Sequence, residues 1–281
     1  MLKLNNLQKN YKDFHLDCTM EIQPGRITGF IGPNGAGKST TIKAVLGLIY
    51  PEGGSIELFG RPTAYASPAD RQRMGVALAE SGFSGELTVR DVGKILTAFY
   101  PCFDPVYYQD KAEALSLPTD KKIKEFSTGM KAKLKVLAAI SHGAELLILD
   151  EPTAGLDVLA RDQLLELLRE YVEADENRAI LISSHISGDL EQLCDDFYMI
   201  DNGRILCHEE TDRLLSDYAI LKVADLTDVD MRYILCRRAE SFGWSLLTDQ
   251  KRFYAENCPG MVIDRISLDE FIMMMLKGEK L

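Results

Sequence analysis

A nine-residue segment near the start of the chain has the residue types of a phosphate-binding loop. Residues 32–40 read Gly-Pro-Asn-Gly-Ala-Gly-Lys-Ser-Thr, which fits the pattern Gly-x4-Gly-Lys-Ser. Glycines lack a Cβ, so successive backbone N–H groups can curl around an anion. A following helix would add its unpaired amides and the positive end of its dipole. Lys38 would then supply a charge to the β- and γ-phosphates, and the Ser39 hydroxyl is placed to bind Mg²⁺.

The segments on either side of this loop are those that a phosphate-binding loop requires. Residues 27–31 are apolar and predict a strand, and an apolar pattern that runs to about Leu48 predicts a helix. Strand, glycine-rich turn and helix together are the context that distinguishes such a loop from a chance match. The sequence therefore predicts a nucleotide site at residues 32–40.

Two carboxylates and a histidine follow later apolar runs. Residues 146–149, Leu-Leu-Ile-Leu, are typical of a parallel strand buried on both faces, and Asp150 and Glu151 come directly after them. An aspartate at this place serves Mg²⁺ in phosphate-loop NTPases. Because neighbouring residues of a strand point to opposite faces, Glu151 is free to act on the attacking water as a general base. His185 follows the next apolar run, so we expect it in the same crevice beyond the strand ends.

Composition bounds the class of protein. With 281 residues, of which 46% are hydrophobic and 27% charged, the chain can bury a substantial core. No run approaches the roughly 18 apolar residues of a membrane-spanning helix, and the first residues do not have the pattern of a cleaved leader, so we expect a cytoplasmic protein. The net charge of −11 argues against an extended nucleic-acid surface. The six cysteines lack metal-ligand spacing.

Periodicity predicts an α/β fold, a phosphate-loop NTPase core with a mostly parallel sheet flanked by helices, over residues 1–217. Alternating apolar and polar residues up to about Ile22 predict an antiparallel β-subdomain with Tyr11 in a turn. Residues 71–130 predict an inserted helical subdomain, in which Thr88 and Asp91 approximate a capping box. Asn-Gly at residues 202–203 predicts a hairpin near the end of this region.

A separate small α+β unit is predicted for residues 218–281. We expect a strand at residues 220–223, a helix at about 229–242, strands at 244–247 and 253–255, and a last helix from Ser267. Glu270 would complete a capping box with Ser267. The three methionines at 273–275 are assigned to core or to a subunit interface, with an adaptable partner groove as the alternative.

These motifs, in this order, resemble those of the ATP-binding-cassette (ABC) ATPases, the nucleotide-binding subunits of membrane transporters. The resemblance covers residue 1 to about residue 217. Residues 126–130, Phe-Ser-Thr-Gly-Met, stand where the family has its Leu-Ser-Gly-Gly-Gln signature, directly before a predicted helix. Residues 154–157, Ala-Gly-Leu-Asp, match the loop that crosses the dimer in that family.

The resemblance implies ATP and Mg²⁺ as cofactors and assigns roles to the matching positions. Glu151 would be the catalytic carboxylate and His185 the switch histidine, while Ser39 and Asp150 would hold Mg²⁺. Nucleotide contacts would come from an aromatic that stacks on adenine, from the phosphate loop and from the signature: Tyr11, Asn34, Gly35, Ala36, Gly37, Lys38, Ser39, Thr40, Ser127 and Gly129.

The signature also implies a partner subunit. Ser127 and Gly129 would lie at a helix N-terminus, which is an anion site, but in this family a signature sits too far from its own phosphate loop to serve it. The resemblance therefore implies a head-to-tail pair that holds two ATP molecules between subunits. A C2 homodimer is the simplest form, and a heterodimer is the alternative. ATP would close this pair and hydrolysis would release it.

The chain departs from the family pattern at two places. Thr128 and Met130 replace Gly and Gln of the signature, a variant that resembles exporter-type cassettes. After the predicted strand at 74–78, Ala79 stands where the family has a Gln that contacts Mg²⁺ and couples to the membrane subunit. The neighbouring Glu80 is the candidate to replace it as an oxygen ligand. We therefore expect slow Mg²⁺-dependent ATP hydrolysis.

Three functional classes are compared. The favoured one is the energising subunit of an ABC transporter, an exporter by resemblance, attached at the inner face of the cell membrane to a separately encoded membrane subunit. The alternative is a soluble ABC-type ATPase acting on nucleic acid, ribosomes or a cytosolic assembly. Such proteins often carry two cassettes, long coiled coils or a basic arm, which this sequence lacks, so no nucleic acid is expected as partner. The third class, a phosphate-loop kinase or GTPase, does not explain why the signature-like residues 126–130 stand directly before a predicted helix.

Overall fold

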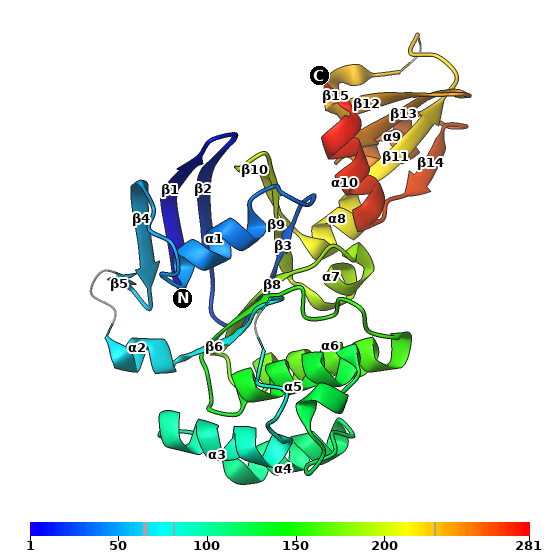
Figure 1. The fold of residues 1–281 in the computed structure, drawn as a ribbon. Helices are drawn as coiled ribbons and strands as arrows, with labels where there is room; N and C mark the ends of the chain where they lie inside the picture. The colour runs from blue at the N-terminus through cyan, green and yellow to red at the C-terminus, as the bar shows by residue number, and fades with distance from the viewer. Residues whose placement is uncertain (64–66, 81, 228) are drawn as a thin grey trace.

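The main feature of the computed structural model, which describes residues 1–63, 67–80, 82–227 and 229–281, is a ten-stranded sheet with helices on both faces (Figure 1). Its strands, in order across the sheet, are β5 (Arg61–Pro62), β4 (Gly53–Leu58), β1 (Leu2–Tyr11), β2 (Phe14–Ile22), β10 (Arg204–Glu210), β9 (Asp196–Asp201), β3 (Ile27–Ile31), β8 (Ala179–Ser183), β7 (Leu146–Asp150) and β6 (Met74–Ala77).

This sheet has a parallel half and an antiparallel half. Strands β6, β7, β8, β3 and β9 run parallel, while β1 pairs antiparallel with both β2 and β4. All residues of β3, β7 and β8 are buried, as expected for parallel strands with both faces covered. The carboxyl ends of these three strands therefore lie at one edge of the sheet. The phosphate loop follows β3, Asp150 is the last residue of β7, and Ser183 is the last residue of β8. The α/β class and the mixed sheet predicted from the sequence are confirmed.

The helices connect these strands and carry the predicted caps. They are α1 (Lys38–Val45), α2 (Pro68–Gln72), α3 (Val89–Phe99), α4 (Pro105–Ala114), α5 (Thr128–Ile140), α6 (Val158–Glu173), α7 (Ser187–Leu193), α8 (Thr211–Asp217), α9 (Lys251–Asn257) and α10 (Leu268–Lys277), with short 3₁₀ turns at Ile123–Glu125 and Met231–Tyr233. Capping boxes form at Thr88 with Asp91 and at Ser267 with Glu270, as predicted. Each box satisfies backbone N–H groups that a helix start leaves unpaired.

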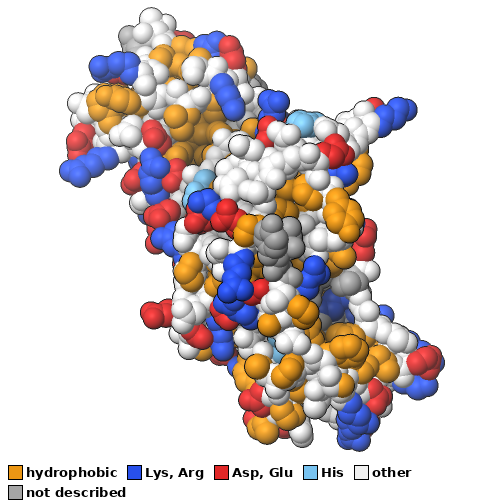
Figure 2. All heavy atoms as spheres, turned by 90° about the vertical axis from the view of Figure 1, so that its left-hand side faces the viewer, with side chains coloured by type: hydrophobic (Ala, Val, Ile, Leu, Met, Phe, Trp, Pro, Cys, Tyr) orange, Lys and Arg blue, Asp and Glu red, His pale blue; other side chains and the backbone are white. Residues whose placement is uncertain are grey.

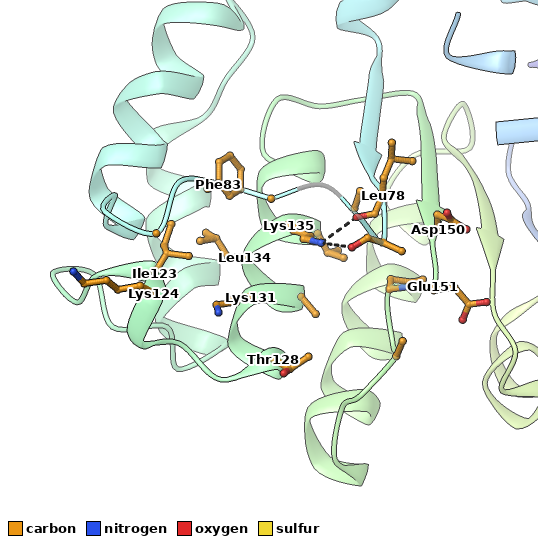
Figure 3. Close-up of a pocket in the computed structure, with 18 residues that line it drawn as sticks. Leu78, Phe83, Ile123, Lys124, Thr128, Lys131, Leu134, Lys135, Asp150 and Glu151 are labelled. Carbon is orange, nitrogen blue, oxygen red and sulfur yellow. Dashed lines mark hydrogen bonds between the residues drawn. The ribbon is translucent and has the colours of Figure 1, made fainter. Parts of the chain in front are cut away.

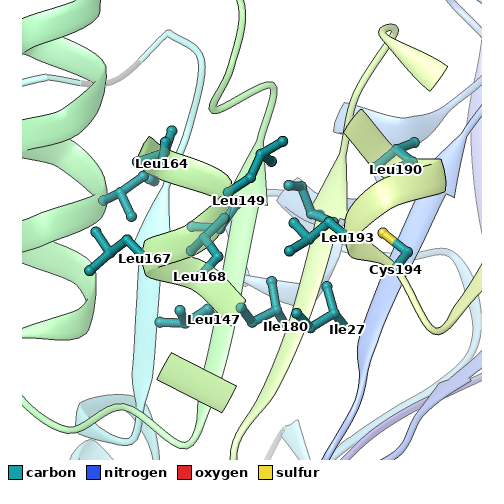
Figure 4. Close-up of a cluster of buried hydrophobic side chains, with 14 of the residues drawn as sticks. Ile27, Leu147, Leu149, Leu164, Leu167, Leu168, Ile180, Leu190, Leu193 and Cys194 are labelled. Atoms are coloured by element: carbon teal, nitrogen blue, oxygen red, sulfur yellow. The ribbon is translucent and has the colours of Figure 1, made fainter. Parts of the chain in front are cut away.

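The two faces of the sheet bury separate apolar clusters. Side chains such as Phe30, Leu146 and Ile148 pack in one cluster with residues of α1. The alternate residues Leu147 and Leu149 point to the other face, where they pack with α5, α6 and α7 (Figure 4). Helices α1 and α5 therefore lie on opposite faces of the same sheet.

The end of the chain forms a second, antiparallel sheet. Its strands, in order, are β14 (Val262–Arg265), β11 (Ala219–Val223), β13 (Gly243–Thr248), β12 (Ile234–Glu240) and β15 (Glu279–Lys280). The expected strands at 220–223 and 244–247 and the last helix are confirmed. The division of the chain at residue 217 into two domains stays a prediction.

Two predictions for this second sheet are wrong. The helix expected at about 229–242 is mainly the strand β12, in which Ile234 and Cys236 are buried on either side of an exposed Leu235. This period of two matches a strand paired between β13 and β15. The strand expected at 253–255 belongs to α9, where Tyr254 is fully buried and its hydroxyl donates to the Asp230 carbonyl. In the helical conformation the Tyr254 side chain is directed into the core, where its ring and hydroxyl both find partners.

Helix α10 attaches the second sheet to the rest of the molecule. The Phe271 ring packs edge-on against Phe197 of β9, at 5.8 Å between centroids, and against Tyr218, at 5.6 Å. These residues belong to the same apolar cluster as α5 and α6. Of the methionine run, Met274 is buried in this cluster and Met273 is partly exposed, so the assignment to core holds for Met274.

Gly75 of β6 should be intolerant of any side chain, because a Cβ there would lie 2.2 Å from the carbonyl oxygen of Ala139 on α5. We expect Gly75→Ala to lower the free energy of unfolding by about 1–3 kcal/mol, the usual cost of overpacking. Gly188→Ala is the matched control, because its Cβ would meet open space on α7 and alanine is the better helix former. Urea unfolding of both variants checks this, and equal stabilities would contradict it.

Candidate functional site

The phosphate loop lies between β3 and α1, as predicted. Gly37 ends the loop with φ 120°, a conformation that side chains other than glycine rarely adopt. A Cβ there would also lie 3.0 Å from the Phe14 ring and 3.2 Å from side-chain carbons of Ile200 and Leu16. Glycine therefore lets the loop pack closely on β2 and β9 before it turns into α1.

Lys38 is folded against its own loop. Its ammonium donates to the carbonyl oxygens of Gly32, at 2.6 Å, and Pro33, at 3.3 Å, and the side chain is buried. Burial lowers the pKa of this ammonium, while the charges of Glu151 and Asp150 act in the opposite direction. The cation is thus held within the loop, where a phosphate oxygen is an alternative acceptor.

Asp150 is the point at which three elements meet. It is buried, and its Oδ2 accepts a hydrogen bond from the Ser39 hydroxyl of α1 at 3.1 Å. Its Oδ1 accepts one from the Ser183 hydroxyl at the end of β8 at 2.6 Å. The two predicted metal ligands, Ser39 and Asp150, are therefore in direct contact. Both present oxygen atoms, the donors that Mg²⁺ prefers.

Glu151 lies one residue beyond the strand, in the left-handed conformation with φ 53°. Strand alternation, which the sequence suggested, therefore does not set the direction of its side chain. Its backbone N–H donates to the carbonyl and to the hydroxyl oxygen of Ser183, both at 3.1 Å. A non-glycine residue in this conformation costs about 1–3 kcal/mol and is held by its surroundings, a feature typical of functional sites.

His185 and Glu151 are paired. The Glu151 Oε2 accepts a hydrogen bond from the His185 backbone N–H at 3.1 Å and contacts the imidazole Nδ1. The Glu151 side chain is mostly shielded, while that of His185 is 55% exposed. The sequence predicted both residues for one crevice, and the structure brings them into contact.

Ser183 is a site residue that the sequence reasoning missed. It is fully buried, and its hydroxyl donates to Asp150 and accepts from the Glu151 backbone. It thereby orients both carboxylate residues at once. The only signal in the sequence was its place at the end of a buried strand, two residues before His185.

The signature and the predicted dimer-crossing loop lie against each other. Ser127 caps α5, with its hydroxyl accepting from the Met130 N–H at 3.2 Å. A Cβ on Gly129 would touch Leu156, and one on Gly155 would touch Thr128. The structure does not bring this group to the phosphate loop, because α5 and α1 cover opposite faces of the sheet.

Tyr11 ends β1 next to the phosphate loop. Its ring is 49% exposed and lies 6.4 Å, between centroids, from that of Phe14, the residue that limits the space at Gly37. The Lys9 ammonium lies over this ring, 5.8 Å from its centroid, so a stacked base would use the opposite face of the ring or displace the lysine.

Glu80 is placed differently from a buried metal ligand. Its side chain is 86% exposed and forms an ion pair with Lys43 of α1 at 3.4 Å. Within the described residues no hydrogen bond or ion pair links it to Ser39 or Asp150. Its role in binding Mg²⁺ stays a prediction. Ala79 lines a pocket of about 520 Å³ between α5 and residues 150–151 (Figure 3).

The exposed face shown in Figure 2 carries acidic and basic side chains side by side, without a broad uniformly basic area. The helices of the described residues are all too short or too polar to cross a bilayer.

Comparison with known proteins shows one family throughout. A sequence profile described as ABC transporter matches residues 16–154. Nod factor export ATP-binding protein I of Cupriavidus metallidurans is 31% identical, over 76% of this chain and 73% of that one. The bacitracin transport ATP-binding protein BcrA of Bacillus licheniformis is 36% identical, over 73% of this chain and 68% of that one. The ABC transporter ATP-binding protein YtrB of Bacillus subtilis is 29% identical, over 82% and 79%.

Solved structures agree with this. The structure of an ATP-binding subunit of an ABC transporter has a TM-score of 0.67 and 30% identity, over 76% of this chain and 91% of that one. A dimeric ATP-binding cassette in a post-hydrolysis state, bound to ADP and Pi, has the same TM-score at 19% identity, over 75% of this chain and 99% of that one, and so shows the shared fold.

Replacement of Ser183 by alanine should destabilise the site, because it leaves one oxygen of Asp150 and the Glu151 N–H without the hydroxyl. We expect the free energy of unfolding to fall by about 1–3 kcal/mol. Ser184→Ala is the control, since among the residues that the structure describes the Ser184 hydroxyl bonds within its own turn, to Ile186. Urea unfolding compares the two variants, and a larger loss for Ser184→Ala would contradict the role assigned to Ser183.

Proposed function

The chain belongs to the ABC transporter family as an ATP-binding, ATP-hydrolysing subunit, and from this premise we propose that it powers export by a separate membrane subunit through the residues of the Asp150 cluster. The observation that carries the residue assignment is the contact of Ser39, Asp150, Ser183, Glu151 and His185 at one edge of the sheet.

The nucleotide is bound first by the phosphate loop. Backbone amides of residues 34–40 and the N-terminus of α1 surround the phosphates. Lys38 exchanges its bonds to the loop carbonyls for bonds to phosphate oxygens. Tyr11 stacks on the adenine from the end of β1. The partial exposure of Tyr11 and its position beside Phe14 support this assignment.

The residues present fit a magnesium ion. The Ser39 hydroxyl and the Asp150 carboxylate converge within hydrogen-bond distance, and Ser183 holds the second carboxylate oxygen in place. Bound there with ATP, Mg²⁺ would neutralise charge that builds on the phosphate oxygens.

Hydrolysis is assigned to Glu151 and His185. Glu151 accepts the proton of the water that attacks the γ-phosphorus, so that the bond to the leaving ADP breaks and inorganic phosphate forms. His185 orients this carboxylate through Oε2, the contact seen in the structure. The left-handed backbone conformation of Glu151 supports the assignment, since such conformations are found mainly at functional sites.

The signature is proposed to act on the ATP of a second subunit. Helix α5, which starts at the signature, packs on the other face of the sheet from α1, which supports contact of Ser127 and Gly129 with the γ-phosphate of a second cassette in a head-to-tail pair. The pair would close on two ATP molecules and open after hydrolysis. A homodimer is the simplest arrangement.

Export is the proposed direction of transport. The relatives named for Nod factor export and bacitracin transport support it, as do Thr128 and Met130 in the signature. The subunit would bind at the inner face of the cell membrane through its membrane partner. The net charge of −11 gives no support to a nucleic-acid partner.

Replacement of Glu151 by glutamine should stop hydrolysis and leave ATP binding intact, because the amide cannot accept the proton. We expect the rate of phosphate release to fall at least about a hundredfold, while the Kd for ATP changes little. Glu176→Gln, an exposed residue between α6 and β8, is the control. A Glu151→Gln variant that turns over as fast as the parent would remove Glu151 from the role of general base.

The shared site predicts dimers that depend on nucleotide. With saturating Mg²⁺ and ATP, the Glu151→Gln variant should become a dimer in light scattering coupled to size exclusion. Adding Ser127→Arg, which places a bulky cation at the exposed start of α5, should leave it monomeric but still able to bind ATP. Ser241→Arg, in the exposed turn before β13, serves as control. A Glu151→Gln protein that stays monomeric at high concentration contradicts the shared site.

A further inference from the structure

Helix α5 has different neighbours near its two ends. Near its C-terminus it lies so close to β6 that a Cβ on Gly75 would clash with the Ala139 carbonyl. Its N-terminal half borders the pocket of about 520 Å³ that separates it from Asp150 and Glu151 (Figure 3). The signature end of α5 packs against residues 155 and 156, and on the side of the pocket polar contacts can add to this packing.

Lys135 lines this pocket and links α5 to the segment that follows β6. It lies between the two halves of α5, and its ammonium donates to the carbonyl oxygens of Leu78 and Ala79, each at 3.0 Å. These are the first two residues after β6, and the two bonds are drawn as dashed lines in Figure 3. The side chain is partly buried, and desolvation lowers its pKa. Because both acceptors are backbone carbonyls, the contact does not depend on the side chain at position 79.

The same short segment is held from its other side by Lys43 of α1, through Glu80. The exposed fractions of those two side chains are 41% and 86%, so solvent and salt screen their ion pair. The two charge-assisted bonds of Lys135 are shorter, and the one to the Leu78 carbonyl is partly buried. Lys135 therefore ties residues 78 and 79 to the signature helix, while the Leu78 side chain packs against the apolar cluster on the α1 side of the sheet.

We propose that Lys135 is a positioning residue that fastens the segment after β6 to α5 and so sets where Ser127 and Gly129 stand relative to Asp150 and Glu151. This rests on the proposed roles of those four residues. In a chain with alanine at position 79, the lysine on α5 supplies a polar link that the loop's own side chain cannot make.

The alternative is that Lys135 only satisfies two carbonyl groups and adds stability. Lys133 separates the two roles, because it lies on the same helix and its ammonium also makes two bonds, to the Leu115 carbonyl at 3.5 Å and to Gln163 at 2.6 Å. Neither of its partners belongs to the segment after β6. Loss of Lys133 should cost stability without changing the link to that segment.

The test uses the full chain with Lys135→Met, Lys135→Arg and Lys133→Met, each in the parent and in the Glu151→Gln background. For Lys135→Met we expect the Kd for ATP of the monomer to stay within about twofold. ATP-driven dimerisation and the turnover rate should weaken about ten- to a hundredfold, as a misplaced group does. Lys135→Arg should restore both to within about threefold, since a guanidinium can also donate to two carbonyls. Lys133→Met should lower the unfolding midpoint but keep turnover and dimerisation.

Several results would overturn the proposal. Turnover and dimerisation at parental levels in Lys135→Met would do so. So would equal losses in Lys133→Met and Lys135→Met, or a failure of Lys135→Arg to restore turnover, because either points to stability alone. If the Glu151→Gln parent itself never dimerises, the shared site fails instead, and Lys135 is then judged on the turnover of Lys135→Met against Lys133→Met.

Discussion

The site depends on hydrogen bonds to both oxygens of one buried carboxylate, that of Asp150. A charge removed from water must find partners within the protein, and Asp150 finds them in Ser39 on one oxygen and Ser183 on the other. Those hydroxyls come from α1 and β8, so the start of the phosphate-binding helix and the ends of two strands are joined at one point. The pairing of β7 with β8 and of β8 with β3 places these groups within reach. The order of the strands in the sheet therefore determines which side chains can bond Asp150.

The sheet also separates the helix of the phosphate loop from the helix of the signature. The residues of β7 alternate between two apolar clusters, one shared with α1 and the other with α5 and α6. Helix α1, which follows the phosphate loop, and α5, which follows the signature, therefore cover opposite faces, an arrangement that agrees with the head-to-tail pair proposed for this chain. Within one chain, the short segment after β6 is contacted by lysines from both helices, Lys135 of α5 and Lys43 of α1.

Much of the core could be predicted because its signals are local. The glycine pattern of residues 32–40 predicts a phosphate loop, and the apolar run before Asp150 predicts a buried strand, without reference to the rest of the chain. The segments at 229–242 and 253–255 could not be read in this way, because tertiary pairing of β12 and burial of Tyr254 overrode local preference. Ser183 and Lys135 escaped notice for a related reason. A serine or a lysine gains its role only from the residue opposite it, and no motif records that neighbour.

Phe271 joins what the sequence suggested were two domains. Its ring lies between Phe197 of the large sheet and Tyr218, within a cluster that extends from α10 to α5. A shared apolar cluster loses its buried area on both sides when either side opens, and the exposure of that area dominates the heat capacity of unfolding. Opening of the terminal unit would therefore expose apolar surface of the large sheet as well as its own, and Phe271 couples the stability of the one to that of the other.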